Sequence, residues 1–123
     1  MGDRIVYEMN QSDGKQLSLY SHWGGSDRYA ALAYALEKAR PRWSDESYCA
    51  RIIVSNLIGP DWADETGYGL WAGPDNGAGD HASITVWLDK QYVEDETGIH
   101  SFDEFIDYHG SIFKVDKPKD VVV

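Results

Sequence analysis

Residues 82–88 read Ala-Ser-Ile-Thr-Val-Trp-Leu, and this stretch decides the fold class. Aliphatic side chains occupy every second position, at Ile84, Val86 and Leu88. A spacing of two is typical of a strand that buries one face, whereas a helix would need apolar residues three or four apart. We therefore expect a strand over residues 82–88, and a sheet around it.

The N-terminal segment supplies a hairpin for the same sheet. Residues 4–9 and 17–20 are rich in aliphatic and aromatic side chains, which favour strands. Between them lies Ser-Asp-Gly-Lys at residues 12–15, and an Asp-Gly pair between two such runs is a strong turn signal.

Two helices are expected next. Apolar residues recur at helical spacing over residues 27–39, with Ser26 or Asp27 as the N-cap and Pro41 beyond the end. A second helix is expected to begin after Ser44 or Asp45 and to end at residues 59–60, a Gly-Pro pair. Cys49 lies on the apolar stripe of this helix, so we expect a buried, inert thiol.

Shorter elements complete the pattern. We expect a strand over residues 67–71, another over residues 91–94, and an edge strand over residues 112–115. Ser101 and Glu104 form a capping-box pattern that predicts a short final helix. The sequence predicts a single α+β domain over residues 1–116, with a mostly antiparallel sheet, two central helices and a short C-terminal helix packed on one face. Residues 117–123 are expected to be a loose tail.

The negative charge lies entirely in the second half of the chain. Residues 1–60 hold seven basic and seven acidic side chains, whereas residues 61–123 hold four lysines and fourteen acids, which gives the net charge of -10. Such a balance disfavours direct binding to nucleic acid and to lipid headgroups, and it favours a partner with a basic surface. The candidate surface consists of Asp64, Glu65, Glu94, Asp95, Glu96, Asp103 and Glu104.

The turn before the first helix is the candidate ligand site. Two glycines followed by a helix start offer free backbone N–H groups to an anion. A histidine, a tryptophan and an arginine nearby would add a proton donor, a stacking ring and a guanidinium. The candidate residues are His22, Trp23, Gly24, Gly25, Ser26 and Arg28. The alternative is that Trp23 packs in the core and the glycines only turn the chain.

Other constellations are weaker. The loop over residues 73–81 holds Asp75, Asp80 and His81 but lacks the spacing of a calcium loop, so a solvated loop is the simpler interpretation. The four histidines at positions 22, 81, 100 and 109 show no paired spacing of a metal site, and no catalytic serine motif is present. We therefore expect no metal, no cofactor and no assigned catalytic residue. No signal peptide or membrane span is expected.

Four stretches together resemble a family of small uncharacterised bacteriophage proteins. They are the Tyr-Ser-His-Trp-Gly-Gly motif at residues 20–25, then residues 42–48, 66–70 and 101–106. The resemblance implies a virus-encoded protein in the host cytoplasm and implies no catalytic residues.

Three functions remain open from the sequence. The first is a viral accessory protein that binds and inhibits a host component, such as a defence protein, through its acidic surface. The second is a protein that binds a small anionic ligand or nucleotide signal at residues 22–28. The third is a small hydrolase that uses His22 or His81 as general base. A homo-oligomer is compatible with all three.

Overall fold

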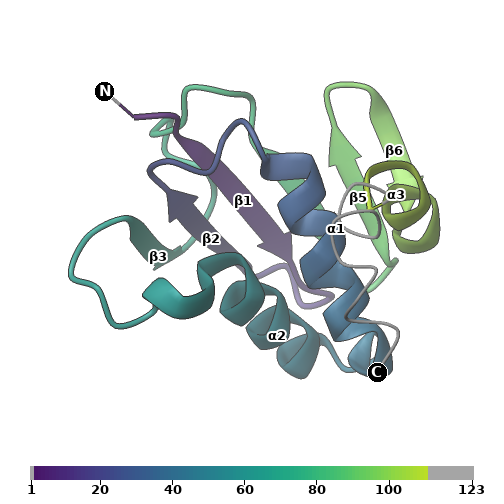
Figure 1. Cartoon of the computed structure of the whole chain (residues 1–123). Helices are drawn as coiled ribbons and strands as arrows, with labels where there is room; N and C mark the ends of the chain where they lie inside the picture. The colour runs from purple at the N-terminus through teal and green to yellow at the C-terminus, as the bar shows by residue number, and fades with distance from the viewer. Residues whose placement is uncertain (1, 111–123) are drawn as a thin grey trace, which may run out of the picture.

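The computed structural model describes residues 2–110, which form one six-stranded sheet and three α-helices (Figure 1). The strands are β1 Ile5–Asn10, β2 Gln16–Ser21, β3 Tyr68–Ala72, β4 Ile84–Trp87, β5 Tyr92–Asp95 and β6 Gly98–Ser101. The helices are α1 Arg28–Ala39, α2 Glu46–Ile58 and α3 Phe102–His109, with short 3-10 turns η1 Arg40–Arg42 and η2 Gly59–Asp61. The predicted α+β class is confirmed.

The strands lie in the order β3-β2-β1-β4-β5-β6. β1 pairs with β4 in parallel, whereas β1 with β2, β2 with β3, β4 with β5 and β5 with β6 are antiparallel. The predicted mostly antiparallel sheet is therefore confirmed, with a parallel pair at its centre. Because β3 and β6 are the two edges, the segments beside them lie at opposite ends of the sheet.

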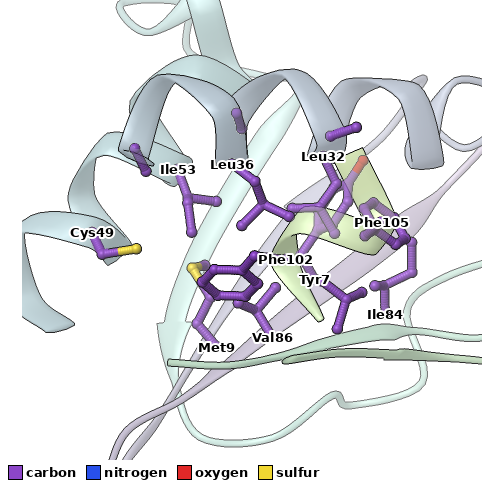
Figure 2. Close-up of a cluster of buried hydrophobic side chains, with 14 of the residues drawn as sticks. Tyr7, Met9, Leu32, Leu36, Cys49, Ile53, Ile84, Val86, Phe102 and Phe105 are labelled. Atoms are coloured by element: carbon purple, nitrogen blue, oxygen red, sulfur yellow. The ribbon is translucent and has the colours of Figure 1, made fainter. Parts of the chain in front are cut away.

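The helices cover one face of this sheet. In Figure 1, α1 and α2 lie in front of β1 and β2, and α3 lies beside β5 and β6. Side chains from the central strands, including Tyr7, Met9 and Val86, point into the core beneath Leu36 of α1 (Figure 2). The alternation that predicts a strand over residues 82–88 is confirmed, since Ile84, Val86 and Leu88 are buried.

The helix ends follow the predictions only in part. Asp45 caps α2, because its side chain accepts a hydrogen bond from the N–H of Tyr48. Asp27 occupies the N-cap position of α1 but makes no side-chain cap bond, and the hydroxyl of Ser26 donates to Asp3 instead. The predicted side-chain cap of α1 is therefore wrong, because the Ser26 hydroxyl donates to the Asp3 carboxylate and Asp27 makes no cap bond.

The C-terminal part holds a strand that the sequence pattern does not predict. β6 pairs with β5 across the turn at residues 95–98. The predicted capping box is confirmed, since Ser101 and Glu104 exchange hydrogen bonds at the start of α3. The predicted strand at residues 112–115, the tail at residues 117–123 and the domain limit at residue 116 lie outside the described residues.

The connection from β3 to β4 crosses the face that the helices leave open. β3 ends beside Leu17 and β4 begins beside Tyr7, so residues 73–83 must return along the length of the sheet. The N–H of Asp75 donates to the carboxylate of Glu8. Glu8 lies between the core residues Tyr7 and Met9 in β1, so its side chain is on the opposite face of the sheet. This loop therefore shields the face opposite the helices.

Candidate functional site

A hollow of about 370 Å³ lies where the turn after β2 meets the end of α2. Its walls come from the turn at residues 23–27, the first turn of α1, Leu57 near the end of α2, and the connector at residues 61–67. Its floor comes from β1 and β2. The lining thus comes from three stretches that are distant in sequence, namely Tyr7 of β1, residues 21–31 and residues 57–68, and it includes part of the predicted ligand turn.

Backbone hydrogen bonds hold the turn against the connector. The N–H of His22 donates to the carbonyl of Gly67 at 2.9 Å, and the N–H of Asp3 donates to the carbonyl of His22 at 2.8 Å. Gly67 has φ of 104°, a conformation that a residue with a side chain rarely adopts. A Cβ placed there would lie 3.5 Å from the ring of Trp23, which is an ordinary contact, so the backbone conformation and not a lack of space favours glycine.

Tyr7 forms part of the floor and carries an unpartnered polar group. The residue is 2% exposed, lines the hollow, and within residues 2–110 its hydroxyl has no hydrogen-bond partner. Burial raises the pKa of this hydroxyl well above its ordinary value, so the group stays protonated and neutral. A neutral phenol can donate one hydrogen bond and accept others. Because Tyr7 lines the hollow and its oxygen is not among the enclosed polar atoms, the hydroxyl is available to a group that enters the hollow.

Three carboxylates surround the hollow. Asp27 precedes α1, and Asp61 and Asp64 belong to the connector; all three are exposed. No side-chain hydrogen bond or ion pair joins any of them to another described residue. Among residues 2–110, no lysine or arginine lines the hollow. Trp23, which is 64% exposed, and Tyr68 add aromatic surface, so the site is both acidic and aromatic.

The predicted anion site is already occupied by a carboxylate of the chain. The N–H of Ser26 donates to Asp3 at 2.6 Å, and the N–H of Gly25 donates to the backbone carbonyl of Asp3 at 2.8 Å. The hydrogen bond from the Ser26 hydroxyl to the Asp3 carboxylate is the main reason that the pKa of Asp3 is lowered. The N–H of Ser26 therefore meets an internal carboxylate, and the N–H of Gly25 meets a backbone carbonyl.

The side chains predicted to assist anion binding are engaged as well. Arg28 donates from Nη1 to the carbonyl of Gly25 at 2.6 Å, and its guanidinium lies over the ring of Tyr29. His22 Nδ1 lies 2.5 Å from the hydroxyl of Tyr20. Of the six residues predicted for this site, Trp23 and Gly24 line the hollow.

The loop at residues 73–81, the weaker candidate site in the sequence, is held in place by hydrogen bonds and ion pairs to the rest of the chain. Asp80 forms an ion pair with Arg4 at 2.9 Å, and His81 Nε2 lies 2.6 Å from Asp3. The side chain of Asp75 accepts a hydrogen bond from the N–H of Gly77. The three polar side chains thus make bonds that fix the loop.

The predicted acidic surface is divided between the two ends of the sheet. Asp64 and Glu65 precede the edge strand β3, whereas the other five belong to β5, its turn and α3 beside the opposite edge. Several of those five have structural partners: Glu94 accepts from Trp87, Asp103 pairs with Arg40, and Glu104 completes the capping box. Asp64 lies at the hollow together with Asp27 and Asp61, so three acids without side-chain partners line one site there.

A second hollow of about 480 Å³ lies between α3, the start of α1 and the β5–β6 turn. His109 stacks on Tyr29 with ring centroids 4.9 Å apart, and burial lowers its pKa. Burial of Asp95 opposes its ionisation, yet hydrogen bonds from Thr97 and the nearby His100 hold its pKa below the ordinary value. Asp95 accepts hydrogen bonds from Thr97, Glu104 completes the capping box, and His100 Nε2 lies 3.0 Å from Thr97 Oγ1, so the charged and polar groups of this hollow are largely engaged within the chain.

No group of three or more metal-binding side chains converges anywhere in residues 2–110. In the same part of the chain, no helix has the length and apolar character needed to cross a membrane. Comparisons with protein-family models, with curated proteins and with solved structures found no match to this chain.

Sequence reasoning missed Tyr7, Asp27 and Asp61 as site residues. Tyr7 lies in a predicted strand and looks like an ordinary core residue, and its unmet hydroxyl is visible only in three dimensions. The sequence does contain a sign of the acidic site, because Asp61 and Asp64 lie close together, beside Trp62, in a connector that has no basic residue.

Proposed function

We propose that this chain is a binding protein, without catalytic activity of its own, that engages a basic surface of a host protein and inhibits that protein. The single observation that carries the proposal is the cluster of three unpaired carboxylates, Asp27, Asp61 and Asp64, around a hollow with no basic lining. Unpaired like charges repel one another, so a cationic partner would relieve this repulsion as it binds.

The overall charge supports the same partner class. With a net charge of -10, the chain would attract a basic surface over a distance of about one Debye length, roughly 8–10 Å at physiological salt. The resemblance of residues 20–25 to phage proteins adds the expectation of a viral origin, a host-cytoplasmic location and a host target such as a defence protein. Under this proposal nucleic acid is not a direct ligand.

The alternatives receive less support from the geometry. A nucleotide or other anion at residues 22–28 would have to displace the Asp3 carboxylate and approach three aspartates. A hydrolase with His81 as base would use an imidazole that already contacts Asp3, and His22 contacts Tyr20. Neither histidine lies beside an unengaged carboxylate within hydrogen-bond distance.

The test compares three proteins that carry an affinity tag. The wild type is set against a hollow variant, Asp27→Asn with Asp61→Asn and Asp64→Asn, and a far-end variant, Glu94→Gln with Glu96→Gln and Asp107→Asn. Both variants lose three charges at exposed positions, so they differ only in place. Host proteins retained by the wild type are identified, purified and titrated at about 50 and about 300 mM NaCl.

We expect wild-type affinity for at least one basic host protein to fall roughly tenfold or more over this salt range, and one variant to bind more weakly than the other. Inhibition is measured on the activity of that purified protein. If the affinity of every retained protein were independent of salt, and both variants bound as the wild type does, binding through an acidic surface would be wrong.

A further inference from the structure

The hollow has a chemistry that selects a particular cation. Its carboxylates are spread around the rim and do not converge on a point, and no three of them in residues 2–110 form a metal-binding group. A spread of acids suits an extended, delocalised charge better than a small ion. The absence of lining lysine or arginine leaves this negative charge uncompensated.

The floor supplies a second and independent feature. Tyr7 is 2% exposed as a residue and lines the hollow, and no hydrogen bond of its hydroxyl is seen among residues 2–110. The oxygen is not one of the fully enclosed, unpartnered polar atoms of that part of the chain, so it is open to the hollow. Its oxygen can accept a hydrogen bond from an N–H group that enters from outside. Acids at the rim and an acceptor at the floor together match a group with several N–H donors.

Aromatic surface at the rim narrows the choice further. Trp23 is 64% exposed and Tyr68 is partly exposed, and both line the hollow. A planar guanidinium stacks on aromatic rings and also forms forked hydrogen bonds with carboxylates, whereas an ammonium is a compact, strongly hydrated charge. The volume of about 370 Å³ lies near the lower end of the range for small-ligand sites, roughly 300–1,000 Å³. One long side chain fits such a space, and a helix does not.

The nearest basic residue does not fill this role. Arg28 lies close enough to Tyr7 to influence its ionisation, but Arg28 is not part of the lining. Its Nη1 donates to the carbonyl of Gly25, and its guanidinium lies over Tyr29. The guanidinium of Arg28 is thus engaged by Gly25 and Tyr29, and it is not part of the lining of the hollow.

We propose that the hollow receives an arginine side chain of the basic partner, with its guanidinium between the acidic rim and the hydroxyl of Tyr7. This inference rests on the proposed function, because it names the group of the partner that the acidic surface recognises. Asp61 and Asp64 pair with the guanidinium at the rim, Tyr7 accepts one of its N–H groups, and Trp23 covers its plane.

The experiment is an NMR titration of the full chain with three blocked peptides. Each is a glycine pentapeptide whose central residue is arginine, lysine or citrulline. Citrulline keeps the shape and most N–H groups of arginine but has no charge. We expect the arginine peptide to shift the amide signals of Gly24, Thr66 and Gly67, with a Kd of about 1–10 mM for one anchoring side chain. The lysine peptide should bind about threefold more weakly, and the citrulline peptide should cause no shifts.

Two variants test the contacts. Tyr7→Phe removes only the hydroxyl, and Asp61→Asn with Asp64→Asn removes two exposed charges. Each variant should bind the arginine peptide with an affinity about three- to tenfold lower than that of the wild type. The matched control, Glu94→Gln with Glu96→Gln, should leave the affinity unchanged. Preserved signal dispersion shows that each variant is folded.

The outcomes separate this inference from the proposed function. Equal binding of the arginine and citrulline peptides, equal binding of lysine, or unchanged affinity of both hollow variants would overturn the arginine site. Salt-dependent binding whose shifts map to β5 and α3 would also overturn it while leaving the acidic-surface proposal intact. If no basic peptide bound at about 20 mM in low salt, and no basic host protein were retained, both proposals would fail.

Discussion

Arg4 and Asp80, which are 76 positions apart in the sequence, are joined by four hydrogen bonds. In one of them the backbone N–H of Asp80 donates to the carbonyl of Arg4 at 2.8 Å, and the other three run from Arg4 to the carboxylate of Asp80. The guanidinium donates two hydrogen bonds to the carboxylate, from Nε at 3.2 Å and from Nη2 at 2.9 Å. The backbone N–H of Arg4 donates to the same carboxylate at 3.0 Å. This forked geometry ties the β3–β4 loop to the start of β1. It is the strongest of the bonds that hold the loop across the sheet, because a charged donor and a charged acceptor meet in a fixed orientation.

The ion pair predicts a defined dependence of stability on pH. The hydrogen bonds from Arg4 lower the pKa of Asp80 to about 2, below its ordinary value of 3.8. A carboxyl whose folded pKa is lowered stabilises the fold above the unfolded pKa, and this contribution is lost as the pH falls through the folded pKa. Asp80→Asn should therefore unfold at lower urea concentration than wild type at pH 7, and the difference should vanish near pH 2.

Urea midpoints between pH 7 and pH 2 measure this effect. Asp89→Asn is the control, because Asp89 is an exposed acid in a turn and loses the same charge. Its difference from wild type should be small at every pH. A gap between Asp80→Asn and wild type that persisted at pH 2 would contradict the assigned role of the carboxylate.

The core predicts a contrast between two leucines. Leu36 of α1 is 0% exposed and lies in the main core cluster, whereas Leu70 of β3 is 55% exposed. Leu36→Ala should lower the free energy of unfolding by about 2–5 kcal/mol, because it removes buried methyl groups and leaves a cavity. Leu70→Ala should change the free energy of unfolding by about 0.5 kcal/mol or less. Chemical denaturation checks both, and equal losses would show that the packing has been misassigned.

The sequence predicts the central elements well because their signals are local. The alternation of Ile84 and Val86 and the Asp45 cap of α2 are properties of short segments. β6 is missed because Gly98–Ser101 contains one large aliphatic side chain, Ile99, and therefore shows no alternation. β6 forms because the turn between the two strands places residues 98–101 beside β5, with which they pair.

The site is harder to predict because long-range contacts decide its chemistry. The glycine turn at residues 24–25 looks suited to an anion until Asp3 is placed against Ser26, which lies 23 residues away. The same turn then becomes a wall of an acidic hollow once Asp61 and Asp64 approach it. Local sequence thus shows the glycine turn, but it does not show the Asp3 carboxylate bound to the turn or the distant acids beside it.

Alanine substitutions at two nearby glycines, Gly67 in the connector and Gly69 in β3, should have opposite effects on stability. Gly67 has φ of 104°, so Gly67→Ala should cost about 1–3 kcal/mol of stability through backbone strain. Gly69 in β3 has no such backbone conformation, and a Cβ there would lie 3.8 Å from Tyr20, which is an ordinary contact. Gly69→Ala should leave stability unchanged or raise it by about 0.5–1 kcal/mol, because alanine loses less entropy on folding. Thermal and urea unfolding of the pair measure the contrast, and equal effects would refute the assigned strain.

The single cysteine predicts protection from thiol reagents in the folded state. Cys49 is 0% exposed, and burial raises the pKa of its thiol to about 11. The reactive thiolate is therefore scarce at pH 8, and a reagent must wait for the helix to open. Reaction with an aromatic disulfide reagent at pH 8 should be slower than in denaturant by at least about a hundredfold. Ile53→Val, which thins the same core with a cost of about 0.5–1.5 kcal/mol, should speed the reaction by about two- to tenfold if opening limits it. Rapid reaction of the native wild type would show that the thiol is accessible and would overturn its assignment as a buried core residue.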